Sequence, residues 1–250
     1  MEHEIVLAPE VIGFINNFPI TNTLLVSWLV MVVLIVVSYL ATRKVQLVPG
    51  GLQNFFEMIV EGGYSMVEDL SHSKAKVFFP FVMTFFLFII TANWLGLLPG
   101  FATIGFFERH DGKEIFVPLL RSINSDLNMT LSLALVSAVV THFFAVKYLG
   151  LKDYLKRWVS LSPIFLFVGL LELVGEATKV VSLSFRLFGN IFAGEVVLST
   201  VASLAKWTAF LVPLPFYFLE IIVGFVQAAV FMMLTLVFMV LLTEKHETSH

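Results

Sequence analysis

The chain contains no cysteine, and this absence removes several kinds of chemistry. It excludes disulfide bonds, thiolate metal sites and a cysteine nucleophile. Charged residues are also scarce, at 13% of 250 residues. The sequence has no HExxH motif, no GxxxxGK[ST] phosphate loop and no Ser and His constellation typical of hydrolases. We therefore expect a chain that is not itself an enzyme, with no metal, no cofactor and no bound nucleic acid.

What the sequence does contain is apolar residues, which make up 58% of it. Several uncharged runs reach about 20 residues, the length needed to cross ~30 Å of hydrocarbon. The amino terminus lacks the basic start of a signal peptide, so the first run should remain in the mature protein. The fold class predicted from these runs is an all-α polytopic membrane protein, with residues 1–250 forming a single membrane domain.

Charge around the apolar runs predicts five membrane crossings. Lys and Arg follow the first run and crowd the loop at 147–157, which assigns these segments to the inside. The amino terminus then lies outside and the carboxyl terminus inside. In chain order, the predicted segments are an outer segment (1–22), a first span (23–42), an amphipathic surface segment (49–72), a second span (77–98), a third span (127–146), a long helix (161–205) and a final helix (216–243).

Two of these segments do not fit a simple span. Residues 49–72 mix aromatic and aliphatic residues with glutamates, which favours an amphipathic helix on the inner membrane surface; a soluble loop helix is the alternative. Residues 161–205 would reach ~60 Å as one helix, twice the hydrocarbon thickness. This helix must tilt steeply, kink or fold back, and we expect two steeply tilted, antiparallel helices at the carboxyl end.

The long helix carries Arg186 within an apolar run. An ionised side chain at the bilayer centre costs roughly 2.5 to 3.5 kcal/mol, so such residues usually mark ion paths. A static interface with a buried ion pair is the alternative. Small residues beside the arginine would allow another helix to approach closely. The residues within about 40° of Arg186 on a helical projection are Lys179, Ser182, Asn190 and Ala193, and Gly189 lies nearby.

Glu195 lies about 180° from Arg186 around the helix and so serves another face. If the last two helices are antiparallel about a turn near residue 207, residues at equal depth have a nearly constant sum of residue numbers. This rule pairs Glu195 with Glu220, and Arg186 with Gln227. Two carboxylates at one depth cannot both ionise cheaply, so the pair can hold a shared proton. Separate wet pockets are the alternative.

Polar residues also gather at both ends of the predicted path. At the outer end, Asn124, Ser125 or Asp126 could cap the third span. The alternative is that Asp126, with Asn128 and Thr130, lines a vestibule. At the inner end, Glu172, Glu176 and Lys179 form a second half-path with Ser182, or only a surface ion pair. Outside these groups, Asn93 is predicted to donate a hydrogen bond between helices and His142 to be packed and hydrogen-bonded.

These motifs resemble the subunit a family of the rotary F-type ATP synthase. The most specific stretch is Ser-Phe-Arg-Leu-Phe-Gly-Asn-Ile-Phe-Ala-Gly-Glu at 184–195. Further support comes from Pro49-Gly50 with Gln53-Asn54, from residues 93–100, from Ser-Asp-Leu-Asn-Met-Thr-Leu at 125–131, and from Gln-Ala-Ala-Val-Phe-Met-Met-Leu-Thr at 227–235. The resemblance covers most of the chain.

The resemblance implies that Arg186 is the essential stator arginine facing the c-ring, with Asn190 and Gln227 as polar neighbours. Glu195 and Glu220 would belong to the half-channel from the outside, although some family members carry histidine where this chain has Glu220. The family matches Asp126 and Asn128 to the entrance and Glu172 to the inner side. Gly189 and Ala193 would face the ring, because they lie beside Arg186.

The family also implies partners and a location. The partners would be the c-ring, the peripheral-stalk subunit b and the remaining ATP synthase subunits, in contact with membrane lipid. The location would be a bacterial plasma (inner) membrane, and the translocated ion H⁺ or Na⁺. The alternative function is a self-contained secondary ion transporter, a class that usually shows internal repeats with paired broken helices. No such repeat is visible in this sequence.

Overall fold

The computed structural model describes residues 9–15, 18–43, 45–48, 50–98, 100–101, 104–110, 113–158, 163–204 and 212–244. Seven α-helices dominate it: α1 (Asn22–Thr42), α2 (Gly51–Ser71), α3 (Ala75–Gly96), α4 (Leu127–Leu149), α5 (Leu151–Trp158), α6 (Pro163–Leu204) and α7 (Leu214–Thr243). Short 3-10 turns, η1 (His72–Lys74) and η3 (Ile123–Ser125), precede α3 and α4.

Five helical segments are long and apolar enough to cross a membrane. They are Asn22–Thr42, Gln53–Gly96, Leu127–Leu149, Phe167–Leu204 and Leu214–Thr243. The second combines α2 and α3, which the η1 turn joins. The predicted class, an all-α polytopic membrane protein with five long apolar segments, is confirmed. The ends of the predicted long helix at 161, 162 and 205 lie outside the described residues.

Two short hairpins and one helix depart from the predicted pattern. Strands β1 (Val11–Ile15) and β2 (Phe18–Thr21) pair antiparallel before α1, and β3 (Gly105–His110) pairs with β4 (Lys113–Pro118) in the loop after the second span. The basic loop contains the helix α5. Each of these elements is short. The prediction was based on hydrophobic runs of membrane length, and such runs do not reveal short strands or helices.

Sequence signals explain where the spans begin and end. Thr21 Oγ1 accepts a hydrogen bond from the Leu24 amide at 3.3 Å and so caps α1. Asp126 Oδ1 accepts one from the Asn128 amide at 2.9 Å and caps α4. The α4 helix ends at Gly150, whose φ of 84° suits a residue without a Cβ atom. The local sequence therefore sets these helix ends.

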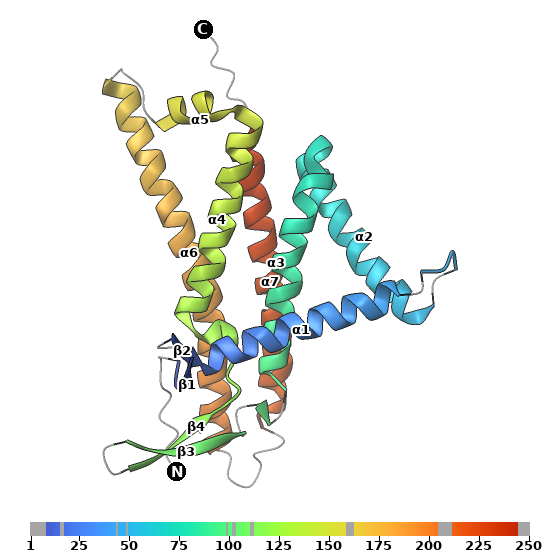
Figure 1. Ribbon diagram of the computed structural model, residues 1–250, viewed down its shortest axis with the longest axis vertical. Helices are drawn as coiled ribbons and strands as arrows, with labels where there is room; N and C mark the ends of the chain where they lie inside the picture. The colour runs from blue at the N-terminus through green and yellow to red at the C-terminus, as the bar shows by residue number, and fades with distance from the viewer. Residues whose placement is uncertain are drawn as a thin grey trace.

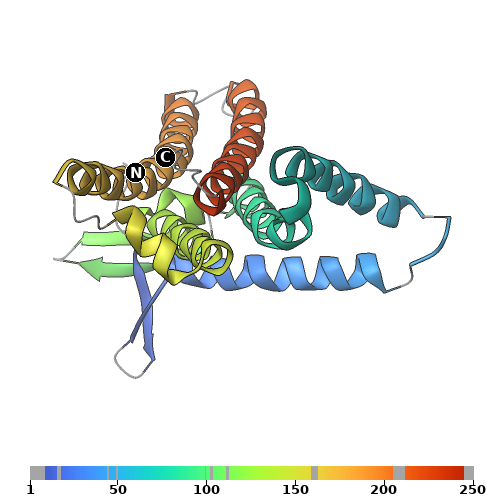
Figure 2. The ribbon, with the colours of Figure 1, turned by 90° about the horizontal axis from the view of Figure 1, so that it is seen from above.

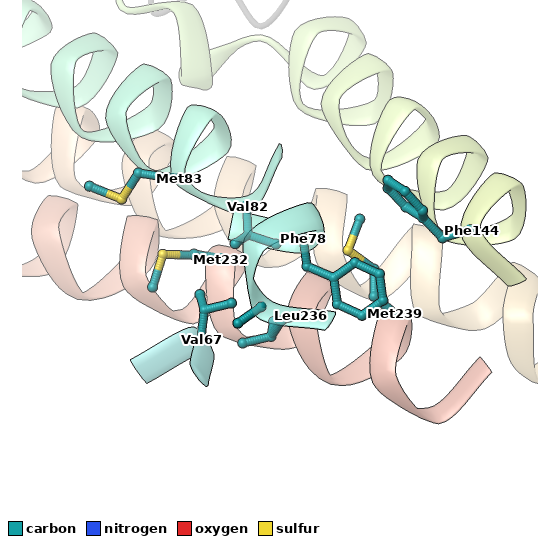
Figure 3. Close-up of a cluster of buried hydrophobic side chains, with 9 residues drawn as sticks. Val67, Phe78, Val82, Met83, Phe144, Met232, Leu236 and Met239 are labelled. Atoms are coloured by element: carbon teal, nitrogen blue, oxygen red, sulfur yellow. The ribbon is translucent and has the colours of Figure 1, made fainter. Parts of the chain in front are cut away.

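The helices pack around a core between α2, α3, α4 and α7 (Figure 3). Its members are apolar and include several methionines, which fill irregular gaps well: Val67, Ala75, Phe78, Val82, Met83, Phe144, Met232, Leu236 and Met239. A second cluster joins α6 to α3, α4 and α7, and its α6 members are Leu183, Leu187 and Ile191. Through these two clusters α7 packs against both α3 and α6. Both helices of the predicted C-terminal pair, α6 and α7, are therefore packed against the other helices.

The chain directions group the loops at two ends of the molecule (Figure 1). The two hairpins, the end of α6 and the start of α7 lie at one end, whereas α5 and the end of α7 lie at the other. The connection between α1 and α2, also predicted to be inside, lies away from both ends, and the sides of the loops stay a prediction. α6 runs for 42 residues as one helix without folding back and lies antiparallel to α7.

α1 runs across the direction of the other helices in both views (Figures 1 and 2). As a helix of 21 residues it is about 32 Å long, which matches the hydrocarbon thickness without tilt. α6, at about 63 Å, must tilt steeply to stay within the same bilayer. The wide angle between α1 and α6 supports this tilt, which stays a prediction.

Candidate functional site

The interface between α6 and α7 contains the polar residues singled out from the sequence. Asn190 Nδ2 on α6 donates a hydrogen bond to Gln227 Oε1 on α7 at 2.8 Å. About one helical turn further along α6, a Cβ atom at Gly194 would occupy the space of the Glu220 carboxylate. These two contacts confirm the antiparallel pairing that was derived from residue numbers.

Arg186 lies beside the buried apolar face of α6, which Leu183, Leu187 and Ile191 form, and is not part of it. Its side chain is exposed, and Nη2 lies 3.5 Å from Ser182 Oγ. Gly189 and Ala193 share the exposed side, and a Cβ atom added at Gly189 would meet nothing within 4 Å. Arg186 also borders a pocket of about 430 Å³ that includes Lys179 and Phe238. The described part of the chain therefore leaves this side of α6 uncovered and open to a partner.

The two glutamates predicted to pair are neighbours in the structure. Glu220 is only 5% exposed and interacts electrostatically with Glu195. Gly194 makes this arrangement possible, because only a residue without a side chain leaves room for the Glu220 carboxylate. Among the described residues, Glu195 Oε2 is buried and has no hydrogen-bond partner. The two acids thus form one buried cluster with unused hydrogen-bonding capacity.

Two residues before α4 complete the acidic cluster. Ser125 of η3 is a side-chain hydrogen-bond neighbour of Glu195, and Arg121 interacts with Glu195 electrostatically. The Arg121 side chain is only 8% exposed. The sequence pointed to Ser125 only as a possible helix cap, and it gave no prediction for Arg121. The available signal was a lone arginine just before a helix start.

The predicted outer group divides into residues with different surroundings. Besides capping α4, Asp126 accepts a hydrogen bond from Thr23 Oγ1 of α1 at 3.0 Å and is buried. The capping interpretation of Asp126 is therefore confirmed. Thr130 is also buried, with its hydroxyl 3.1 Å from that of Ser184 on α6. Asn128, by contrast, has an exposed side chain.

The predicted inner group lies along α6 toward its amino end. Lys179 Nζ pairs with Glu176 Oε1 at 2.7 Å and lies 4.8 Å from the centre of the Phe238 ring. Glu172, one turn before Glu176, is half-buried. Lys179 and Glu176 thus form an ion pair, and the second half-path along this row stays a prediction. Ser182 continues this row toward Arg186 along the same pocket.

Predictions about two further polar residues are confirmed. Asn93 Nδ2 of α3 donates to the Gly224 carbonyl of α7 at 3.0 Å, and Asn124 Nδ2 donates to Asn93 Oδ1 at 2.7 Å. This buried chain of amides ties η3 and α3 to α7 one turn after Glu220. His142 Nδ1 lies 3.0 Å from the Tyr154 hydroxyl. Asn124 was considered from the sequence only as a helix cap, and its hydrogen bond to Asn93 was not predicted.

No group of three or more His, Cys, Asp or Glu side chains within the described ranges is arranged to hold a metal ion. What the site offers is one exposed cation on α6, a buried pair of carboxylates with its own arginine, and an ion pair toward the other end. These are groups that exchange and stabilise charge.

Comparison with known proteins agrees with this arrangement. The family described as ATP synthase A chain matches residues 24–240. ATP synthase subunit a of Citrifermentans bemidjiense is 38% identical over 215 residues, covering 85% of this chain and 83% of that protein. The Geobacter sulfurreducens protein of the same name is 35% identical over the same shares, and that of Syntrophobacter fumaroxidans is 32% identical over 93% and 89%. The chain therefore belongs to the ATP synthase A chain family, subunit a of the F-type ATP synthase.

Proposed function

We propose that this chain is the ion-translocating stator subunit of a rotary ATP synthase, with two offset half-channels and Arg186 facing the c-ring. The proposal rests on the position of Arg186, which lies on an uncovered side of α6 with the small residues Gly189 and Ala193 beside it. A buried arginine locked in an ion pair would have favoured a static role. An exposed arginine on a surface that another helix can approach closely suits a moving partner.

The arginine acts through its charge. When a ring carboxylate arrives opposite Arg186, the guanidinium stabilises the ionised carboxylate, which releases its ion into one half-path. After the carboxylate has passed the arginine, it takes a new ion from the other half-path. Because the guanidinium also repels a cation that would pass directly, it separates the two paths. Asn190 and Gln227 stay hydrogen-bonded to each other one turn away and keep α7 against α6 at this depth.

The outer half-path runs through the acidic cluster. Glu195 and Glu220 interact electrostatically, and the unpartnered Glu195 Oε2 can accept a hydrogen bond or a proton. Asn128 lies at the outer start of α4 with its side chain exposed. Asp126 supports this entrance only indirectly, because its carboxylate already accepts hydrogen bonds from the Asn128 amide at the start of α4 and from the Thr23 hydroxyl.

The inner half-path follows the pocket beside α6. Lys179, Ser182 and Arg186 border this pocket. Glu176 holds Lys179 at 2.7 Å, and Glu172 lies one turn nearer the amino end of α6. These two carboxylates on the amino-terminal side of the lysine give an ion leaving the ring a polar route past an otherwise apolar helix.

The surroundings follow from this role. The chain is an integral membrane protein, and we place its amino terminus outside and its carboxyl terminus in the cytoplasm of a bacterium. It assembles with the other ATP synthase subunits, among them the c-ring and the peripheral-stalk subunit b. ATP chemistry belongs to those partners, and this chain is not catalytic. Each elementary charge that crosses the full potential supplies ~2.3 kcal/mol per 100 mV for ring rotation.

The test is ion-driven ATP synthesis by the reconstituted complex with Arg186→Ala. We expect assembly to be retained, because the side chain is exposed, and synthesis to be lost. Arg186→Lys keeps the charge but not the planar, multi-donor head, so it should not restore full synthesis. Arg43→Gln, at an exposed arginine after α1, is the control. Near-normal coupled synthesis in the alanine variant would refute the stator role.

A further inference from the structure

Three cavities follow one another along α6, toward the end of the molecule where α5 lies (Figure 1). The Arg186 pocket described above is also lined by Lys179, Leu183 and Phe238. A small cavity of about 20 Å³ between α4, α6 and α7 is lined by the same three residues. A third pocket of about 420 Å³, the α5 pocket, lies between α4, α5 and α6 and shares Glu176 with the small cavity. The small cavity therefore lies between the Arg186 pocket and the α5 pocket.

The α4 wall of the small cavity is partly polar although it is deeply buried. Ser137 is 2% exposed and Thr141 is 3% exposed, and both line the cavity. Thr141 Oγ1 donates a hydrogen bond to the Ser137 carbonyl at 2.8 Å, and the Ser137 hydroxyl lies 2.9 Å from that of Thr235 on α7. A hydroxyl that donates one hydrogen bond can still accept others. This wall thus presents hydrogen-bond acceptors to a space enclosed by three helices.

The opposite wall of the small cavity contains the ion pair of α6. Lys179 Nζ donates to Glu176 Oε1 at 2.7 Å, and both residues line the cavity. An ammonium group has three N–H donors and a carboxylate has two acceptor oxygens, so one contact between them leaves further bonds possible. A bound water needs at least ~10–15 Å³ and two to four polar partners. A volume of about 20 Å³ between these polar walls meets both requirements for one water molecule.

We propose that the small cavity binds one water molecule, which relays protons between the Arg186 pocket and the α5 pocket. Ser137 and Thr141 are positioning residues, which hold this water against the pair of Glu176 and Lys179. The inference rests on the proposed function and extends its inner half-path. It adds that the path passes between α6 and α4 and does not only follow the uncovered side of α6.

The relay balances without a further reactant. A proton that reaches the Arg186 pocket forms a new O–H bond on the bound water, while another O–H bond of the same water breaks toward the α5 pocket. The water is restored after each transfer. Because Glu176 offsets the charge of Lys179, the proton passes an ion pair without net charge. A cavity for one water also leaves no room for the hydration shell of a metal ion, so this path favours protons.

The α5 pocket gives the path a polar end. His142 and Tyr154 line this pocket, and the Tyr154 hydroxyl lies 3.0 Å from His142 Nδ1. Both α5 and the start of α6 lie at the end of the molecule that is predicted to be inside (Figure 1). A proton that leaves the small cavity therefore enters a pocket with polar side chains on the predicted inner side.

The experiment uses the assembled complex with substitutions on α4. Thr141→Val keeps the shape of the side chain and removes its hydroxyl, whereas Thr141→Ser keeps the hydroxyl. Ala138→Leu places a larger side chain at the wall of the small cavity. Thr84→Val is the matched control, because the Thr84 hydroxyl also donates to the carbonyl four residues earlier but lies on the exposed side of α3. Passive proton flow through the membrane sector is measured together with the amount of assembled complex.

We expect Thr141→Val to lower proton flow per assembled complex about fivefold, which corresponds to the loss of one neutral hydrogen bond. Thr141→Ser should keep most of the flow. Ala138→Leu should lower the flow further, because its side chain displaces the water. Thr84→Val should leave the flow unchanged.

A second measurement locates the water independently of transport. An electron cryo-microscopy map of the complex, detailed enough to show ordered water, should contain one within hydrogen-bonding distance of Thr141 Oγ1. The corresponding map of Thr141→Val should lack it. If Thr141→Val does not assemble, the map of the unsubstituted complex and the flow of Ala138→Leu decide the question.

A small cavity without water in the unsubstituted complex would overturn the inference. So would equal flow in Thr141→Val and Thr84→Val, or an equal loss in Thr141→Ser and Thr141→Val, which would make Thr141 a packing residue. The proposed function fails separately. If Arg186→Ala synthesises ATP normally, the stator role is wrong whatever the α4 variants do. If Arg186→Ala blocks synthesis and Thr141→Val conducts protons normally, only this inference is wrong.

Discussion

Gly194→Ala should impair the proton path while leaving the fold largely intact. A methyl group at this position would occupy the space of the Glu220 carboxylate, which is the far end of a flexible side chain. Glu220 can therefore rotate away without displacing the backbone of α7. When it does so, it leaves Glu195, the partner with which it interacts across the interface. The substitution should alter the acidic pair far more than the packing of the two helices.

The expected change in stability is small because two effects oppose each other. Overpacking of a well-packed site costs typically 1–3 kcal/mol, and the mobile carboxylate places this case near the lower end. Replacing glycine by alanine within a helix gains about 1 kcal/mol. The net change in the free energy of unfolding should thus lie within about 2 kcal/mol. Proton flow should fall by roughly ten- to a hundredfold, because small displacements of reacting groups are costly.

The assay is passive proton flow through the reconstituted membrane sector, measured with the amount of assembled complex. Gly62→Ala is the control, because a Cβ atom there would meet nothing within 4 Å and the helix gains the same propensity. Adding Glu220→Asp to Gly194→Ala shortens the acid by one methylene and should recover part of the flow. Normal flow in Gly194→Ala, or a loss of assembly equal to the loss of flow, would refute this account of the contact.

Three further predictions follow from the same structure. Glu195→Gln and Glu220→Gln should each slow proton flow, and the double variant should lose less than the two single losses combined, because the acids act as one unit; additive losses would indicate separate pockets. Asn93→Leu should lower the melting temperature of the complex, since it removes the hydrogen bond to the Gly224 carbonyl and takes from the buried Asn124 amide its Asn93 acceptor, at a cost of about 1–3 kcal/mol; an unchanged melting temperature would contradict this. Single cysteines in this cysteine-free chain should react with impermeant reagents from outside at Glu2 and His110, and from inside at Lys152 and Ser249; outside reaction at Ser249 would overturn the five-crossing topology.

The long helices and their pairing could be predicted from the sequence because helical periodicity is regular over many residues. Arg186, Asn190 and Glu195 lie on one straight element, so their directions follow from 100° per residue. An antiparallel partner adds only one unknown, the position of the turn. The contacts of Asn190 with Gln227 and of Gly194 with Glu220 therefore agree with the predicted pairing.

The contacts of Arg121, Asn124 and Ser125 could not be predicted in the same way. These residues belong to an extended connection and a short 3-10 turn, where no period fixes the direction of a side chain. Their partners lie on α3 and α6, far away in the chain. Asp126 shows the related difficulty that one residue type suits two roles. A carboxylate before a helix can cap it or line a path, and only its hydrogen bonds to Thr23 and Asn128 distinguish these.

The central claim, that the uncovered side of α6 at Arg186 faces the c-ring, is tested most directly by disulfide crosslinking in the assembled complex. A cysteine replacing Ala193 is paired with one placed a turn from the membrane carboxylate of the ring subunit, with Val181→Cys, about 140° around the helix from Arg186 and also exposed, as the control. The account predicts a crosslink to the ring subunit from position 193 and none from position 181. A crosslink from position 181 with none from position 193 would contradict it.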